Sequence, residues 1–197
     1  VCFSDLGNDV ICVDRDLKKI NNLKNGKVPI YEPGLEELVQ KNNKNKTLKF
    51  STNLKESVSK SDIIFICVGT QTKKNGSGAD LGQVYGVAKE IRNSINKFKI
   101  IVTKSTVPVT TGDEIEKIIS FKKSKKLFSV VSNPEFLREG EAISDFTYPD
   151  RVVVGTNNKK SNEILKNLYA PLISKGAQYI NTSRRAAELI KYASNSF

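Results

Sequence analysis

The sequence is organised around the stretch Ser132-Asn-Pro-Glu-Phe-Leu-Arg-Glu-Gly140. This stretch follows an apolar run, Leu127 to Val131, that predicts a buried strand, and Pro134 prevents the strand from continuing into a hydrogen-bonded ladder. The chain must therefore turn, and Glu135 and Glu139 follow four residues apart. A single helical turn would place both carboxylates on one side, at the carboxyl end of a strand, where open α/β sheets bind ligands. The alternative is an ordinary strand-to-loop exit with solvated glutamates.

The composition predicts a soluble protein of the cytoplasm. The chain has 197 residues, enough to bury a sizeable core. No run approaches the roughly 18 apolar residues that a membrane span needs, and nothing resembles a signal peptide. The three cysteines, Cys2, Cys12 and Cys67, lie singly in apolar runs, which favours a reducing compartment and core positions over disulfides or a metal site.

The absence of histidine narrows the possible chemistry. It excludes Ser-His-Asp triads, His–Cys pairs and most catalytic zinc sites, so acid–base work must fall to Glu, Asp, Lys, Tyr or Cys. The net charge of +11 raises the possibility of nucleic-acid binding. Because the lysines are spread along the chain and interleaved with asparagine rather than with aromatic residues, we expect no nucleic-acid partner.

An acidic residue ends the first predicted strand, Asp9 to Val13. In a dinucleotide-binding βαβ unit, such a residue binds the adenosine ribose and lies about 20 residues after a Gly-x-Gly-x-x-Gly loop. If Asp14 has this role, the glycine-rich loop and the first strand would precede residue 1. Asp14 would also favour NAD over NADP, although Arg15 weakens that inference, and Asp commonly ends strands without binding a nucleotide.

Two further strand ends carry candidate cofactor contacts. The apolar run Ile63 to Val68 predicts a buried parallel strand, and the small residues Gly69 and Thr70 after it would let a cofactor approach the backbone closely. We therefore assign Val68, Gly69 and Thr70 to the nucleotide edge.

The strand predicted over Lys99 to Thr103 is followed by the hydroxyls of Ser105 and Thr106. The next predicted helix, Asp113 to Ile119, has an amino terminus that favours negative ligands. An ordinary hydroxyl-rich helix start explains the same pattern equally well.

The last predicted helix, Ser183 to Phe197, places Lys191 and Asn195 on one face. The alternative is that Lys191 pairs with Glu188 on a wet surface. Strands and helices alternate before it, which predicts an α/β fold with a doubly wound, Rossmann-like, mostly parallel sheet. With no linker before about residue 183, we expect one domain over residues 1–182, followed by this last helix over residues 183–197.

The expected strand order, 3-2-1-4-5-6, has one further consequence. The absent first strand would be central, so the strands Val10 to Val13 and Ile63 to Val68 would flank an unfilled position. The remaining expected elements are helices over Val1 to Leu6, Leu17 to Asn25, Leu35 to Lys41, Leu81 to Ile95 and Ser161 to Leu168, and strands over Leu48 to Phe50, Pro149 to Gly155 and Ala177 to Asn181.

Several motifs together resemble the nucleotide-sugar (UDP-glucose/GDP-mannose) dehydrogenase family. They occur in the family's order and cover almost the whole chain. The motifs are Cys12-Val-Asp14, Pro29-Ile-Tyr-Glu-Pro-Gly-Leu-Glu-Glu-Leu38, Val68-Gly-Thr70, Val102-Thr-Lys-Ser-Thr-Val-Pro108, Ser132 to Gly140, Pro149-Asp-Arg151 and Ala187-Glu-Leu-Ile-Lys-Tyr-Ala-Ser-Asn195.

The resemblance implies oxidation of UDP-glucose at C6 to UDP-glucuronate in two hydride transfers to NAD, with a cysteine capturing the aldehyde. By motif, Thr106 would position the catalytic water, Glu135 and Glu139 would flank the reacting carbon, and Lys191 and Asn195 would stabilise oxyanions. The resemblance also implies a homodimer, with an incomplete NAD-binding domain over residues 1–182 and the start of a central dimerisation helix over residues 183–197. Substrate contacts would come from Glu135, Phe136, Leu137, Arg138, Lys191 and Asn195, and NAD contacts from Asp14, Lys19, Val68, Gly69, Thr70, Ser105, Thr106 and Glu139.

The sequence also departs from the family pattern. The glycine-rich loop is absent, Gln71 stands where a proline is usual, and the family's nucleophilic cysteine lies in a motif beyond residue 197. We therefore expect an N-terminal part of such an enzyme, inactive by itself. The alternatives are a related dehydrogenase of UDP-N-acetylmannosamine or GDP-mannose and a non-catalytic nucleotide-binding module.

Overall fold

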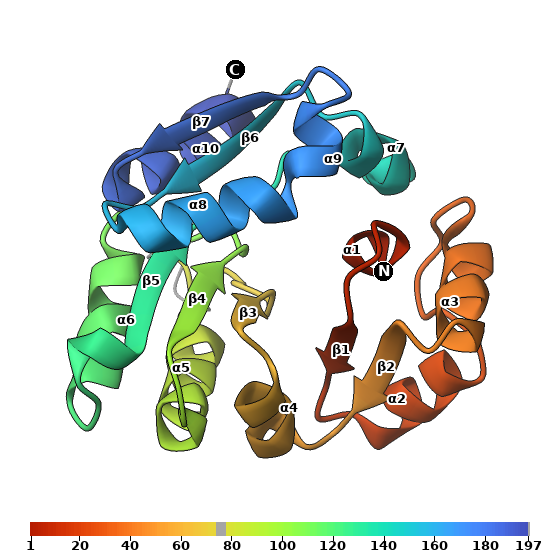
Figure 1. Cartoon of the computed structure of the whole chain (residues 1–197), viewed down its shortest axis with the longest axis horizontal. Coiled ribbons are helices and arrows are strands. Elements are labelled where there is room, and N and C mark those ends of the chain that lie inside the picture. The colour runs from red at the N-terminus through yellow and green to blue at the C-terminus, as the bar shows by residue number, and fades with distance from the viewer. Residues whose placement is uncertain (74–77, 197) are drawn as a thin grey trace.

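The computed structural model describes residues 1–73 and 78–196, with side chains up to residue 194 in these ranges. The described residues form an α/β fold in which strands and helices alternate (Figure 1). The strands are β1 (Val10–Val13), β2 (Leu48–Ser51), β3 (Ile63–Ile66), β4 (Lys99–Thr103), β5 (Phe128–Ser132), β6 (Arg151–Gly155) and β7 (Gln178–Thr182). The helices are α1 (Cys2–Asp5), α2 (Leu17–Lys24), α3 (Leu35–Lys44), α4 (Leu54–Lys60), α5 (Gly82–Ser94), α6 (Thr111–Ser120), α7 (Ala142–Thr147), α8 (Lys159–Leu168), α9 (Ala170–Ile173) and α10 (Arg184–Ser196), with a 3-10 turn η1 at Lys125–Leu127.

The strands form two sheets. β1 and β2 make a parallel two-stranded sheet, and the other strands make a five-stranded sheet in the order β3-β4-β5-β6-β7. Pairing in the larger sheet is parallel except between β5 and β6, which meet antiparallel at Ser132 and Gly155. The predicted doubly wound, mostly parallel α/β fold is confirmed.

The two sheets lie next to each other without strand pairing between β1 and β3. Among the described strands, β1 pairs only with β2, and β3 pairs only with β4. Figure 1 shows β1 and β2 with α2 and α3 on one side of the molecule and the larger sheet on the other. This agrees with the expectation that the two strands flank a position that no described strand fills.

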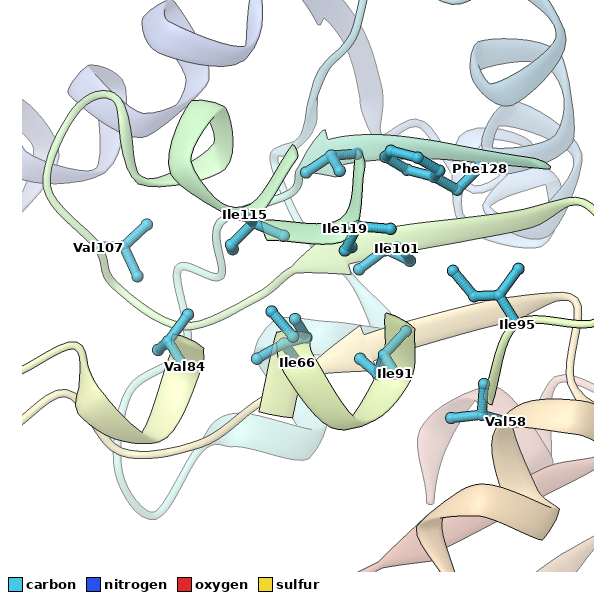
Figure 2. Packing of buried hydrophobic residues seen from close by; sticks show 12 residues of the cluster. Val58, Ile66, Val84, Ile91, Ile95, Ile101, Val107, Ile115, Ile119 and Phe128 are labelled. Atoms are coloured by element: carbon cyan, nitrogen blue, oxygen red, sulfur yellow. The ribbon is translucent and has the colours of Figure 1, made fainter. Parts of the chain in front are cut away.

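Helices cover both faces of the larger sheet. On one face, α5 and α6 bury Val84, Ile91, Ile115 and Ile119 against Ile66 and Ile101 (Figure 2). On the other face, α8 and α9 bury Leu165 and Leu172 against β4, β5 and β6. A smaller cluster of Ile20, Val39, Leu48 and Phe50 joins α2 and α3 to the β1–β2 sheet. Alternate residues of one strand, such as Ile100 and Ile101, enter opposite clusters, as expected for a strand covered on both faces.

The signals at the helix ends predicted most boundaries well. Asp16 caps α2 by accepting hydrogen bonds from the backbone N–H groups of Lys18 and Lys19. Gly7 and Gly26 have the positive φ angles, 90° and 77°, that suit the ends of α1 and α2. The structure also contains α4, α7 and α9, which the sequence did not predict, and α3 continues to Lys44. None of the helices in the described part of the chain is long and apolar enough to cross a membrane.

The strand expected to reach Val68 ends earlier, at Ile66. The carbonyl oxygen of Ile66 accepts the backbone N–H of Lys104, and that of Val68 accepts the Ser105 hydroxyl at 2.7 Å. Beyond Ile66, a side-chain hydrogen bond from the neighbouring strand end therefore replaces the backbone ladder.

Candidate functional site

The carboxyl ends of β3 and β4 are tied together by hydroxyl groups. The Ser105 hydroxyl donates to the carbonyl oxygen of Val68, and the Thr70 hydroxyl donates to the carbonyl oxygen of Thr106 at 2.8 Å. A side-chain carbon added at Gly69 would meet nothing within 4 Å, so space is open beside this backbone. The structure thus brings together the strand-end residues that the sequence assigned to the nucleotide edge.

Asp14 and Lys19 meet at the carboxyl end of β1. The Lys19 amine lies 2.5 Å from one carboxylate oxygen of Asp14, and the other oxygen accepts the backbone N–H of Asp16 at 3.0 Å. The Lys19 amine holds the pKa of Asp14 below its usual value, with the Asp16 N–H as a second cause. Asp14 is therefore ionised at neutral pH, which suits an acceptor for ribose hydroxyl groups.

Arg15 does not stand free beside Asp14. Its guanidinium pairs with the Glu90 carboxylate of α5, and both side chains are exposed. The pair gives Arg15 a carboxylate partner within the chain, although an exposed pair of this kind is weak and leaves the guanidinium accessible.

Glu135 and Lys191 form an ion pair between the loop after β5 and α10. Their charged atoms lie 3.2 Å apart, with side chains 28% and 8% exposed, respectively. The second carboxylate oxygen of Glu135 accepts the backbone N–H of Leu137 at 2.7 Å. The structure therefore joins two residues that the sequence had placed in one site from separate motifs.

The expectation of a helical turn carrying Glu135 and Glu139 is wrong. The segment between Asn133 and Arg138 is irregular, and a turn follows at Glu139 and Gly140, where the φ angle of Gly140 is 80°. Pro134 and the bond from the Leu137 N–H to the Glu135 side chain remove the backbone donors that a helix would need. Glu139 is exposed in this turn and forms no ion pair with a described residue.

The Phe136 ring is in contact with two cations. The Arg151 guanidinium carbon is 4.9 Å from the ring centroid, and the Lys191 amine is 5.4 Å from it. Arg151 also donates to the Ser194 hydroxyl of α10 at 3.3 Å. The Phe136 ring, which also contacts Arg151, therefore helps to hold the Lys191 amine in place.

Two predicted contact residues follow Phe136, and both are exposed. Leu137 is exposed, and Arg138 pairs with Asp145 of α7 at 2.7 Å and with Glu141 at 2.5 Å. Glu32 accepts the backbone N–H groups of Gly140 and Ile143, so the Pro29 to Leu38 motif fastens this loop. The side chain of Asn195, the remaining predicted site residue, is not among those that the structure describes.

Lys104 is a site residue to which sequence reasoning gave no role. Its amine donates to Asn133 at 3.2 Å and lies 5.9 Å from the centroid of the Tyr169 ring, and the Tyr169 hydroxyl donates to the same oxygen of Asn133. Burial lowers the pKa of Lys104 to about 8, with Lys191 adding to the decrease and Cys67 and Glu135 opposing it. A lysine inside an otherwise apolar and hydroxyl-bearing strand end was the signal available in the sequence.

The amino terminus of α6 is already occupied by a carboxylate of the chain. Glu188 accepts the backbone N–H groups of Thr110 and Gly112, each at 2.8 Å. Two of the N–H groups that would attract a negative ligand are therefore satisfied within the chain. The alternative pairing of Lys191 with Glu188 on a wet surface is wrong, because both residues are buried and Lys191 pairs with Glu135.

The arrangement fits a nicotinamide dinucleotide. An ionised carboxylate at the end of β1, open space at Gly69 and hydroxyls at the ends of β3 and β4 lie along the carboxyl edge where such cofactors bind. The same edge supplies a carboxylate and a buried amine, Glu135 and Lys191, a pair that can accept a proton and stabilise a developing negative charge.

Comparisons with known proteins agree with this description. Residues 1–173 match the model of the UDP-glucose/GDP-mannose dehydrogenase family, NAD binding domain. The chain is 48% identical over 199 residues to the UDP-glucose 6-dehydrogenase of Rhizobium meliloti (strain 1021), covering 100% of this chain and 46% of the relative. It is 46% identical over 197 residues to the UDP-glucose 6-dehydrogenase TuaD of Bacillus subtilis (strain 168), covering 100% of this chain and 42% of the relative.

Solved structures give the same picture. A ternary complex of GDP-mannose dehydrogenase from Pseudomonas aeruginosa superposes with a TM-score of 0.92 at 39% identity, covering 99% of this chain and 45% of the other. A UDP-glucose dehydrogenase from Pyrobaculum islandicum gives a TM-score of 0.93 at 36% identity, covering 98% and 45%. The chain spans less than half the length of these relatives. With its NAD-binding domain match and its Rossmann-like fold, the chain belongs to the UDP-glucose/GDP-mannose dehydrogenase family.

Proposed function

We propose that this chain is the NAD-binding part of a cytoplasmic nucleotide-sugar dehydrogenase that oxidises UDP-glucose at C6 to UDP-glucuronate. The observation that carries the proposal is the ion pair of Glu135 with the buried Lys191, at the edge of a family NAD-binding domain. A domain that only binds a nucleotide gains nothing from a buried amine held against a carboxylate, because burying charges costs free energy.

The residues present suit separate roles in this reaction. Asp14 and Lys19 would bind the adenosine ribose, and the strand-end segments Val68–Thr70 and Ser105–Thr106 would hold the rest of NAD. NAD itself accepts the hydride. Glu135 would act as the proton acceptor, and Lys191 would stabilise the oxyanion formed at C6.

Further residues would position the substrate and water. Thr106 would hold the catalytic water, and Asn195 would share the oxyanion role of Lys191. We assign Glu139 to a place near the nicotinamide. Phe136, Leu137 and Arg138 would contact the nucleotide sugar.

The assembly of the complete protein is part of the proposal. Residues 1–182 would form the NAD-binding domain, and residues 183–197 would begin a central helix used in a homodimer. The nucleophilic cysteine of the family mechanism would come from a further part of the protein, since burial raises the pKa of the Cys2, Cys12 and Cys67 thiols and keeps them in the less reactive protonated form.

One alternative substrate has support of its own. The superposition on a GDP-mannose dehydrogenase is nearly as close as that on a UDP-glucose dehydrogenase. GDP-mannose is therefore offered beside UDP-glucose in the assay.

The test is NADH formation by the complete protein that carries this chain, followed at 340 nm with UDP-glucose, GDP-mannose and UDP-N-acetylmannosamine offered separately. We expect turnover with UDP-glucose and two NADH molecules formed per sugar. Preferred turnover of another sugar would replace the substrate assignment. Binding of NAD without turnover of any of the three would favour a non-catalytic module.

A further inference from the structure

One carboxylate links the helix that carries Lys191 to the loop that carries Thr106. Glu188 is 2% exposed, and its two oxygens accept the backbone N–H groups of Thr110 and Gly112 at 2.8 Å each. These N–H groups belong to the cap and the first turn of α6, which have no partner inside the helix. The negative charge also matches the positive end of the helix dipole, so this contact is stronger than a neutral hydrogen bond.

A second contact joins the same two helices. Arg184 of α10 pairs with Asp113 and Glu116 of α6, the latter at 2.9 Å. A side-chain carbon added at Gly112 would collide with the Arg184 side chain, so the helices meet without spare room. Glu188 is therefore one of two separate fastenings between α10 and α6.

The position of α10 is also fixed by its close contact with β6. A side-chain carbon at Gly155 of β6 would lie 2.5 Å from the Ala187 side chain and 2.8 Å from the Arg184 backbone. Only glycine allows this close approach of helix to strand. Since α10 cannot shift on the sheet, whatever Glu188 holds is held relative to the sheet.

The backbone that Glu188 holds is strained. Thr110 has a φ angle of 81°, a left-handed conformation that β-branched residues seldom adopt. Such a residue persists only where its surroundings fix it. The hydrogen bond from its N–H to Glu188 is one of those constraints, and the segment from Ser105 to Thr110 ends at this residue.

We infer that Glu188 is a positioning residue of the proposed active site, which sets the Thr106 loop in register with Lys191. Glu188 and Lys191 lie one helical turn apart on α10, and the loop from Ser105 to Thr110 runs directly into the groups that Glu188 binds. Both Glu188 oxygens are taken by backbone N–H groups, so Glu188 would act through the loop and not by contact with substrate or cofactor. The inference rests on the proposed function for its effect on turnover, but its structural part does not.

The test compares Glu188→Ala and Glu188→Gln with the control Glu163→Gln, which removes an exposed carboxylate from α8. Amide hydrogen exchange at Thr110 and Gly112, kcat and KM for NAD are measured on the complete protein. We expect Glu188→Ala to lose protection at both amides and to lower kcat about 10-fold to 100-fold, because a small misplacement of reacting groups costs that much. KM for NAD should rise by a smaller factor than kcat falls, since the Asp14 contact to the cofactor lies outside the perturbed loop.

The conservative variant separates positioning from simple loss of stability. Gln keeps one acceptor oxygen, so Glu188→Gln should protect one of the two amides from exchange and recover part of kcat. This variant also decides the test if Glu188→Ala fails to fold. Unchanged exchange at Thr110 and Gly112, or unchanged kcat in a folded Glu188 variant, would overturn the inference. If the wild type oxidises no nucleotide sugar, the proposed function fails, and the exchange data alone decide whether Glu188 holds the Thr106 loop.

Discussion

The amine of Lys191 lies 3.2 Å from a carboxylate oxygen of Glu135, although one residue belongs to the last helix and the other to the loop after β5. The Lys191 amine also contacts the Phe136 ring, and the Arg151 guanidinium contacts the same ring. The carboxylate and the aromatic ring offset part of the cost of burying the Lys191 amine. The pair therefore behaves as a unit, and changes to either residue should affect the other.

Replacing Glu135 by glutamine should cripple turnover and leave NAD binding nearly intact. The amide keeps the shape of the side chain but cannot accept the proton, so kcat should fall roughly 10²- to 10⁴-fold. NADH formation gives kcat, and titration calorimetry gives the Kd for NAD. Glu163→Gln, which removes an exposed carboxylate, is the matched control. An equal loss of turnover and of NAD affinity would refute the role of Glu135.

Replacing Asp14 by asparagine should weaken NAD binding. The substitution removes the ionised acceptor at the end of β1 and leaves Lys19 without its partner, a loss of about 1.4 kcal/mol or tenfold in Kd. Asp9→Asn, at the exposed residue directly before the same strand, is the control and should bind NAD as the wild type does. Calorimetric Kd values within twofold for all three proteins would contradict the assignment of Asp14 to the ribose.

Because of Lys104, the free energy of unfolding should increase as the pH rises from about 8 to about 10.5. Its folded pKa, about 8, lies below the usual 10.5, so the unfolded chain binds more protons between these values and the free energy of unfolding increases with pH there. Below pH 8 both states hold the proton, and the folded state bears the cost of a desolvated cation. Lys104→Met should remove this pH dependence and raise stability at pH 7 by about 1–2 kcal/mol, less than the full shift implies because the side chain is partly exposed.

Urea unfolding at pH 7, 8 and 10 measures this effect. The groups that face the Lys104 amine are Asn133, Tyr169, Cys67, Glu135 and Lys191, and the burial-raised pKa of Cys67 makes a comparison with Cys67→Ala necessary. Lys166→Met, at an exposed position of α8, is the control. A pH profile that Lys104→Met leaves unchanged would show that another group causes it.

Two glycine substitutions should change stability in opposite directions. Alanine at Gly155 would push α10 off β6 and should cost about 1–3 kcal/mol. Alanine at Gly86 of α5 would meet nothing within 4 Å and should add about 0.5–1 kcal/mol, because alanine is the better helix former. Urea unfolding of both variants gives the two signs. A Gly155→Ala protein as stable as the wild type would mean that α10 can move away from β6 at little cost in free energy.

The sequence predicted the layout of the sheet more accurately than the local shape of the site. Apolar runs such as Lys99 to Thr103 report burial on both faces directly, and Asp16 and Gly26 mark the ends of α2 by their own chemistry. The four-residue spacing of Glu135 and Glu139 suggested a helix, but Pro134 and the Leu137 N–H bond prevent it. Spacing on a helix is informative only where the backbone donors are free to form one.

Long-range pairing was beyond single-sequence reasoning. Glu188 looked like a surface partner of Lys191 because the two are three residues apart, yet Thr110 and Gly112 lie far away in sequence and nothing in their residue types announces a carboxylate acceptor. The joining of Lys191 to Glu135 was foreseen only through the family resemblance. Lys104 was visible in the sequence as a lone cation, but its partners Asn133 and Tyr169 come from other strand and helix ends.

The division of the strands into two sheets has a consequence for handling the protein. β1 and β3 each present one backbone edge that no other described strand satisfies. Open strand edges recruit strands from neighbouring molecules, and β3, Ile-Ile-Phe-Ile, has the apolar composition that favours such aggregation. We expect this 197-residue chain to self-associate with increasing concentration, and light scattering that stays monomeric throughout a dilution series would speak against it.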